Sequence, residues 1–156
     1  MLKNTFTVNP ITFEVVTERV INASAAKLFE VYTDPLLIPK WWGDPALVTT
    51  VERFNLNEGG SWRFIQTEPN GTIIAWDGIY QEIVAPSKIV STFVLEPQPG
   101  HVYIGTALFT PLSDKTTKYT ETIKFLNLED MNQLVNMDVQ NKSATRVDRL
   151  ARLVEN

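Results

Sequence analysis

The sequence contains no cysteine and a single histidine, His101. Disulfides, thiolate metal sites and a cysteine nucleophile are therefore excluded. A typical zinc site is excluded as well, because it needs several cysteine or histidine ligands. His101 stands beside Gly100 in a predicted loop, and no pattern of further ligands surrounds it. We expect a protein without a metal or another cofactor.

Concentrated positive charge and long apolar runs are also missing. The formal net charge is -4 and the isoelectric point is near 5.0, which disfavours nucleic acid as a partner because phosphate binding needs a basic face. No run approaches the ~20 apolar residues of a membrane span, and the N-terminal residues do not resemble a signal peptide. We therefore expect no membrane span. A cytoplasmic location is expected, and the absence of cysteine agrees with it.

The chain has 156 residues, of which 44% are hydrophobic and 21% are charged. These values are typical of one globular domain with a sizeable core. Neither an internal repeat nor a linker-like change of composition divides the sequence. We expect a single domain over residues 1–156, for which a homodimer remains compatible with the sequence.

Short elements of alternating type are predicted along the chain. Ile11 to Asn22 is rich in β-branched residues and is typical of a strand. Ser24 is a plausible N-cap of a short helix, and Asp34-Pro35 predicts a second helical turn. Between Leu47 and Phe125 the pattern indicates six further strands, which gives seven in total.

Asn70-Gly71 is a strong signal for a β-hairpin with a two-residue loop. If these two residues form the whole loop, Trp62 lies opposite Ile79 on the neighbouring strand. The same register places Phe64 opposite Asp77. This register predicts that Asp77 shares a face of the sheet with Phe64.

The last predicted strand alternates clearly, and its inward face carries Tyr119, Glu121, Ile123 and Phe125. A long helix is predicted from Asn127 to Val154, with apolar stripes near both ends. Its middle, Asp138 to Ser143, is polar. Such a helix often covers a cavity.

Several motifs in this order resemble a known family. They are Asp34-Pro35, Trp41-Trp42-Gly43, residues 57–64 (NEGGSWRF), Asn70-Gly71, residues 78–83 (GIYQEI) and residues 147–153 (VDRLARL). The chain is similar to the START-like (SRPBCC) helix-grip superfamily, in the branch named for the C-terminal domain of the heat-shock protein 90 ATPase activator. The resemblance implies an α+β fold in which a curved antiparallel sheet surrounds a long C-terminal helix.

The resemblance also implies a hydrophobic cavity between the sheet and that helix. The residues expected to line it are Trp41, Trp42, Trp62, Phe64, Asp77, Ile79, Tyr119, Glu121 and Ile123. The two adjacent tryptophans form a ligand-facing lid, or they only pack the short helices against the sheet. Where the family often has Gly-Trp, this chain has Lys142-Ser143, which predicts a wider or wetter pocket.

Glu121 is the most informative polar residue of the sequence. Its neighbours on the same strand face are apolar, so its carboxylate is predicted to point inward. An unpaired charge there is costly, which predicts a raised pKa or a partner such as an arginine, a tyrosine or a ligand donor. A ligand or acid–base role and a structural ion pair both remain open.

Three functions compete. The leading hypothesis is binding of a small hydrophobic or amphipathic molecule, such as a lipid, a polyketide-like compound or an aromatic metabolite. The second is a cofactor-free cyclase, dehydratase or hydrolase that uses Glu121 or Asp77 as general acid or base. The third, a co-chaperone, ranks last: in the activator a separate N-terminal domain makes an essential contact with the chaperone. This chain has little sequence before its predicted first strand.

Overall fold

The computed structural model describes residues 4–155, which form one antiparallel sheet with four helices. The strands are β1 (Thr5–Asn9), β2 (Glu14–Ile21), β3 (Val48–Phe54), β4 (Ser61–Thr67), β5 (Ile73–Val84), β6 (Lys88–Leu95), β7 (Val102–Ser113) and β8 (Thr116–Lys124). The helices are α1 (Ala25–Tyr32), α2 (Ile38–Trp41), α3 (Leu128–Asn136) and α4 (Val139–Val154).

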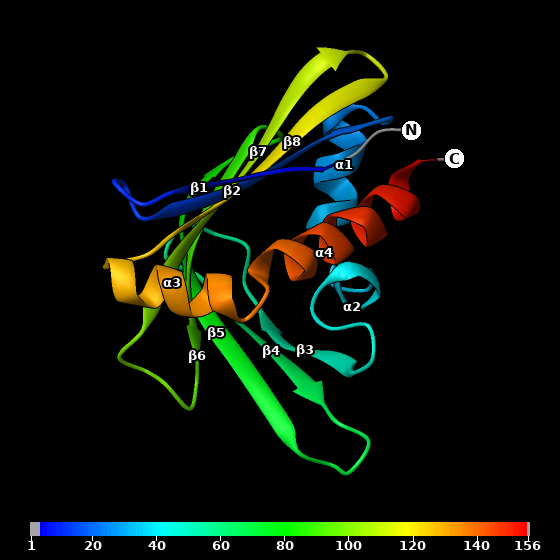
Figure 1. The fold of residues 1–156 in the computed structure, drawn as a ribbon. Coiled ribbons are helices and arrows are strands. Elements are labelled where there is room, and N and C mark those ends of the chain that lie inside the picture. The colour runs from blue at the N-terminus through cyan, green and yellow to red at the C-terminus, as the bar shows by residue number, and fades with distance from the viewer. Residues whose placement is uncertain (1–3, 156) are drawn as a thin grey trace.

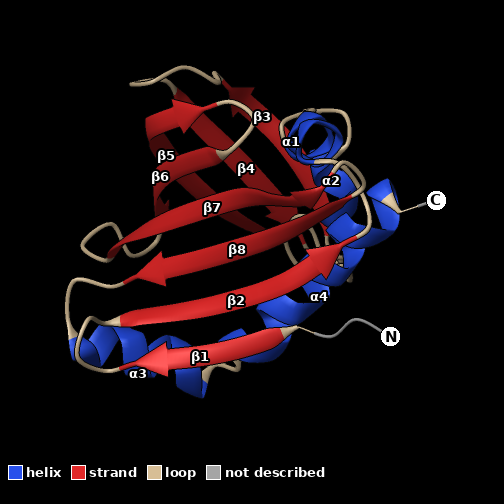
Figure 2. Ribbon diagram, turned by 90° about the horizontal axis from the view of Figure 1, so that it is seen from above, coloured by secondary structure: helices blue, strands red, loops and turns tan. Residues whose placement is uncertain are grey.

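The sheet has the strand order β1-β2-β8-β7-β6-β5-β4-β3. It bends strongly, and its concave face holds the C-terminal helix α4 (Figure 1). Helices α1 and α2 lie beside α4, and α3 lies beneath the end of the sheet that carries β1 and β2 (Figure 2). The predicted helix-grip architecture is confirmed. None of the helices within residues 4–155 is long and apolar enough to cross a membrane.

The sheet has eight strands, so the predicted number of seven is wrong. The N-terminal segment forms a hairpin in which β1 pairs with β2. The Asn9 side chain closes this hairpin by accepting hydrogen bonds from the backbone N–H groups of Ile11 (2.9 Å) and Thr12 (3.2 Å). Phe13 then has a positive φ of 60°, after which β2 begins. Strand β1 is mostly exposed and only five residues long, so the alternation of Phe6 and Val8 with polar residues is a weak signal for a strand.

The predicted register between β4 and β5 is wrong by one residue. The loop has three residues, because the N–H of Glu68 bonds to the carbonyl of Thr72 (2.8 Å). Gly71 has a φ of 90°, as expected where a glycine ends a three-residue hairpin loop. The one-residue shift places Gly78 opposite Trp62.

The predicted helix from Asn127 to Val154 is two helices. The chain turns at Asp138, which has a left-handed φ of 65°. Aspartate tolerates this conformation better than most residues, and the Asp138 carboxylate also accepts a hydrogen bond from the side chain of Asn141 (2.9 Å). The break lets α3 and α4 follow different directions across the curved sheet (Figure 1).

Helix α4 is the centre of the main core. Its buried stripe of Val147, Leu150, Ala151 and Val154 packs with buried residues of α1 and the sheet. Burying a valine or leucine side chain contributes about 1.5–3 kcal/mol. A second cluster, which includes Tyr103, Ile123 and Met131, lies under α3. Of the two predicted apolar stripes, the later one therefore packs in the main core and the earlier one packs in the second cluster.

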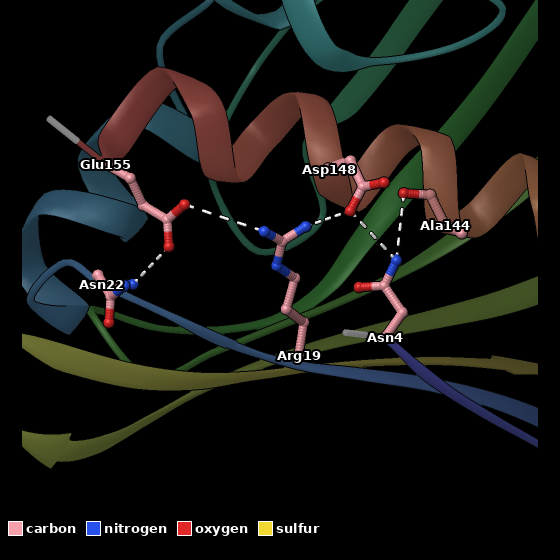
Figure 3. A network of polar contacts seen from close by, with 6 residues as sticks. All are labelled: Asn4, Arg19, Asn22, Ala144, Asp148 and Glu155. Carbon is pink, nitrogen blue, oxygen red and sulfur yellow. Dashed lines mark hydrogen bonds and ion pairs between the residues drawn. The ribbon is translucent and has the colours of Figure 1, made fainter. Parts of the chain in front are cut away.

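Polar contacts attach the outer side of α4 to β1 and β2 (Figure 3). Arg19 of β2 forms an ion pair with Asp148 and a longer one, at 3.9 Å, with Glu155. Asn4 donates to the Asp148 carboxylate (3.3 Å), and the N–H of Asn22 donates to Glu155 (2.8 Å). These contacts hold the C-terminal half of α4 along β2.

Replacement of Gly78 tests the close approach between β5 and the Trp62 ring. A Cβ at Gly78 would lie 1.9 Å from the carbonyl oxygen of Thr92 and 2.6 Å from Trp62 Nε1. Gly78→Ala is expected to lower the free energy of unfolding, measured in urea, by about 2–3 kcal/mol. Gly100→Ala is the control, because no atom lies within 4 Å of its added Cβ. Equal stability of the two variants would contradict this packing.

Candidate functional site

Aromatic side chains cover the inner face of β4. The rings of Trp62 and Phe64 lie 4.6 Å apart, and Trp42 meets both of them edge-on, at 6.3 and 5.1 Å. The indole N–H of Trp62 donates to the Ser91 hydroxyl (2.8 Å). Trp62 and Phe64 are buried, whereas Trp42 is half-buried. Three of the predicted site residues are thus brought together.

Trp41 points to a different neighbour from Trp42. It is 3% exposed and stacks on Tyr32 of α1, with ring centres 4.7 Å apart. Its indole Nε1 is buried and has no hydrogen-bond partner among the described residues. Trp41 therefore packs with Tyr32, whereas Trp42 packs with the aromatic residues of β4.

Glu121 faces the interior, as predicted, and its partner is Arg146 of α4. The guanidinium donates twice to the carboxylate, through Nε at 3.2 Å and through Nη2 at a shorter distance. Nη2 also donates to the hydroxyl of Ser143 (3.2 Å). The side chains of Glu121 and Arg146 are 13% and 22% exposed. Burial lowers the pKa of Arg146, but the charge and hydrogen bonds of Glu121, with smaller contributions from Tyr119 and Tyr32, together hold that pKa above its usual range.

Two tyrosines extend this polar centre. The Tyr119 hydroxyl donates to Glu121 (3.4 Å), and the rings of Tyr119 and Tyr32 lie 6.0 Å apart. Burial and then the charge of Glu121 raise the pKa of Tyr32 to about 12, although Tyr119 and Arg146 counteract them. Burial, followed by Tyr32 and Glu121, raises the pKa of Tyr119 well above its usual range. Both phenols are therefore neutral at physiological pH.

Asp77 and Ile79 do not join this group. In the observed register they pair with Arg63 and Ser61, on the face of the sheet opposite to Trp62 and Phe64. Ile79 is 51% exposed. Burial and contact with Glu96 raise the pKa of Asp77. The prediction that Asp77 shares a face with Phe64 is therefore wrong, and the cause is the longer hairpin loop.

The two remaining features lie under α3. Ile123 is buried in the second cluster, away from the aromatic group of β4. His101 Nδ1 lies 2.8 Å from the buried carboxylate of Asp130, which also belongs to the N-terminal turn of α3. Residues 4–155 contain no group of three side chains suited to hold a metal ion.

On the surface of residues 4–155, two hollows lie away from the predicted site. One is open and is lined by residues of α3 and by Met137, which follows that helix. The other lies between the start of α1 and the β7–β8 turn. The lining of these two hollows includes none of the predicted site residues.

Arg146 and Tyr32 were not predicted as site residues, and Ser143 was named only as part of Lys142-Ser143. Ser143 and Arg146 are three residues apart on α4, beside the stripe that includes Val147 and Leu150. Helical spacing from that stripe would have turned Arg146 toward the sheet. Nothing in the sequence alone shows that its partner is Glu121.

The comparisons with known proteins agree with this architecture. The model of the family described as "Activator of Hsp90 ATPase homolog 1-like protein" matches residues 22–155. The chain belongs to this family. The predicted family relationship is thus confirmed, and no curated protein matches the chain.

Similar solved structures support the fold of this family member. A Mycobacterium smegmatis protein is 19% identical, with coverage of 99% and 97% of the two chains and a TM-score of 0.85. An Arthrobacter aurescens protein is 20% identical, with coverage of 96% and 90% and a TM-score of 0.85. A Staphylococcus epidermidis protein is 22% identical, with coverage of 95% and 93% and a TM-score of 0.80.

Alkaline titration tests the buried tyrosines. The chain has four tyrosines, and burial raises the pKa of each: Tyr32, Tyr80, Tyr103 and Tyr119. Above pH about 10 the unfolded chain loses tyrosine protons that the folded chain retains, so stability falls as the pH rises. Tyrosinate absorbs at 295 nm. In the native protein this absorbance should rise only at a pH above the midpoint of tyrosine titration in the urea-unfolded protein. Coincident midpoints of the native and unfolded protein would contradict the burial.

Proposed function

We propose that the protein binds a small, largely apolar molecule between α4 and the inner face of the sheet. The observation that carries the proposal is the Glu121–Arg146 pair, a partly accessible polar centre that lies within an aromatic interior. Removing charges from water costs free energy, so such a pair is a weak source of stability. Charged groups of this kind are enriched at functional sites.

The inner surface beside Glu121 favours the same proposal. Ala107 of β7 pairs with Glu121, and next to it Gly105 pairs with Ser91 of β6. Small residues at these three positions leave more room beside Glu121 than large ones would, although the ring of Phe93 lies 3.4 Å from the position of an added Cβ at Gly105. The aromatic side chains of Trp42, Trp62 and Phe64 supply the apolar wall that a ligand body needs.

The other two hypotheses have less support. Because Asp77 lies on the outer face, Glu121 is the remaining predicted carboxylate for acid–base chemistry, and Arg146 already engages it. The family description names an activator of a chaperone ATPase, and that activity remains a hypothesis for this chain. Ligand binding therefore leads.

Binding of the neutral dye Nile red tests the proposed function. The folded protein should bind the dye with raised fluorescence, and Trp42→Ala should weaken binding by about tenfold, which corresponds to about 1.4 kcal/mol. The half-buried Trp42 is chosen because its loss leaves the buried pair Trp62 and Phe64 in place.

Leu36→Ala is the control for the dye experiment, because Leu36 is 82% exposed and lies outside the proposed site. Circular dichroism and urea unfolding should show that both variants are folded. Equal loss of binding in the two variants, or dye binding only to unfolded protein, would contradict the proposal.

A further inference from the structure

We propose that the bound molecule carries a neutral hydrogen-bond acceptor, a carbonyl oxygen on an aromatic or alkyl body, at the end that meets Tyr32, Trp41 and Arg146. This inference rests on the proposed function and adds the chemical class of the ligand. It follows from a count of the donors and acceptors of the polar centre.

The polar centre has more donors than acceptors. Nη1 of Arg146 has no acceptor among the described residues, since the hydrogen bonds of this guanidinium use Nε and Nη2. The Tyr32 hydroxyl interacts with the hydroxyl of Tyr119 and has no carboxylate or carbonyl acceptor within residues 4–155. Trp41 is 3% exposed, and its buried indole N–H has no hydrogen-bond partner within residues 4–155.

The only charged acceptor of this centre is already engaged. Glu121 receives hydrogen bonds from Arg146 Nε, Arg146 Nη2 and Tyr119. A ligand that brings only donors, or no polar group, therefore leaves the surplus donors unpaired. Of these donors, the Trp41 indole N–H is buried and unpaired, which costs free energy that a ligand oxygen would recover.

The donors belong to one contiguous set of side chains. Trp41 stacks on Tyr32, Tyr32 lies beside Tyr119, and Tyr119 bonds to Glu121, which holds Arg146. The set joins α2, α1, β8 and α4. The proposal places one end of the small molecule against this set.

The acceptor is neutral because the centre disfavours a second anion. Glu121 already balances the charge of Arg146. Burial, with a smaller contribution from the negative charge of Glu121, raises the pKa values of Tyr32 and Tyr119, so these phenols resist becoming anions. A ligand carboxylate at the same place would meet the same repulsion.

Three naphthalene probes of similar shape test this inference by competition with Nile red. They are 2-acetylnaphthalene, a neutral ketone; 2-isopropylnaphthalene, which lacks the acceptor; and 2-naphthoate at pH 8, an anion. After correction for octanol–water partition, the ketone should bind about tenfold more tightly than the hydrocarbon, as expected for recovered hydrogen bonds. The naphthoate should compete least well.

Two variants each remove one donor and keep an aromatic ring at the position. Tyr32→Phe and Trp41→Phe should each reduce the preference for the ketone several-fold and leave binding of the hydrocarbon unchanged. Tyr103→Phe is the matched control, because Tyr103 is a buried tyrosine of the second cluster. Its preference for the ketone should equal that of the unaltered protein. Thermal unfolding should show that all three variants are folded.

The outcomes separate this inference from the proposed function. Equal binding of ketone and hydrocarbon, or a ketone preference that survives both variants, overturns the inference and leaves the binding function intact. Strongest competition by naphthoate also overturns it, in favour of an anion site. If neither Nile red nor any probe binds the folded protein, the proposed function itself fails.

Discussion

The ion pair between Glu121 of β8 and Arg146 of α4 is the interaction on which the arrangement of the interior depends. A carboxylate on the concave face of a sheet needs a partner, because an unpaired charge in apolar surroundings is costly. The partner lies on the helix that the sheet encloses, so the pair fixes how α4 is turned relative to β8. Once α4 is turned in this way, Val147 and Leu150 reach the main core and Ser143 lies beside the guanidinium.

The same pair relates the fold to the proposed function. Tyr119, Tyr32 and Trp41 extend from it into the aromatic interior, and their polar atoms are neutral donors. The ion pair between Arg19 and Asp148 attaches the opposite side of α4 to β2 (Figure 3). The side of α4 that carries Arg146 is therefore not needed for that attachment. A small-molecule site of this type is mostly apolar and has a few polar groups that orient the ligand.

The sequence predicts those parts of the structure that local patterns determine. The alternation from Lys118 to Phe125 correctly predicted the inward face of β8, because a strand with one buried face has a period of two. The hairpin register failed because a two-residue and a three-residue loop share the signal Asn70-Gly71. The break at Asp138 was missed because helical periodicity continues on both sides of it. The need of Glu121 for a partner was predictable, but its identity depends on a contact distant in sequence.

A double-mutant cycle on the ion pair tests the central claim most directly. Urea unfolding would be measured for Arg146→Met, Glu121→Leu and the double variant. Arg146→Met alone should lower the free energy of unfolding by about 3 kcal/mol, near the lower end for a buried pair because both side chains are partly exposed. The double variant should recover most of that loss, since it leaves no charge unpaired. Small and additive losses in the three variants would contradict the claim that this pair organises the interior.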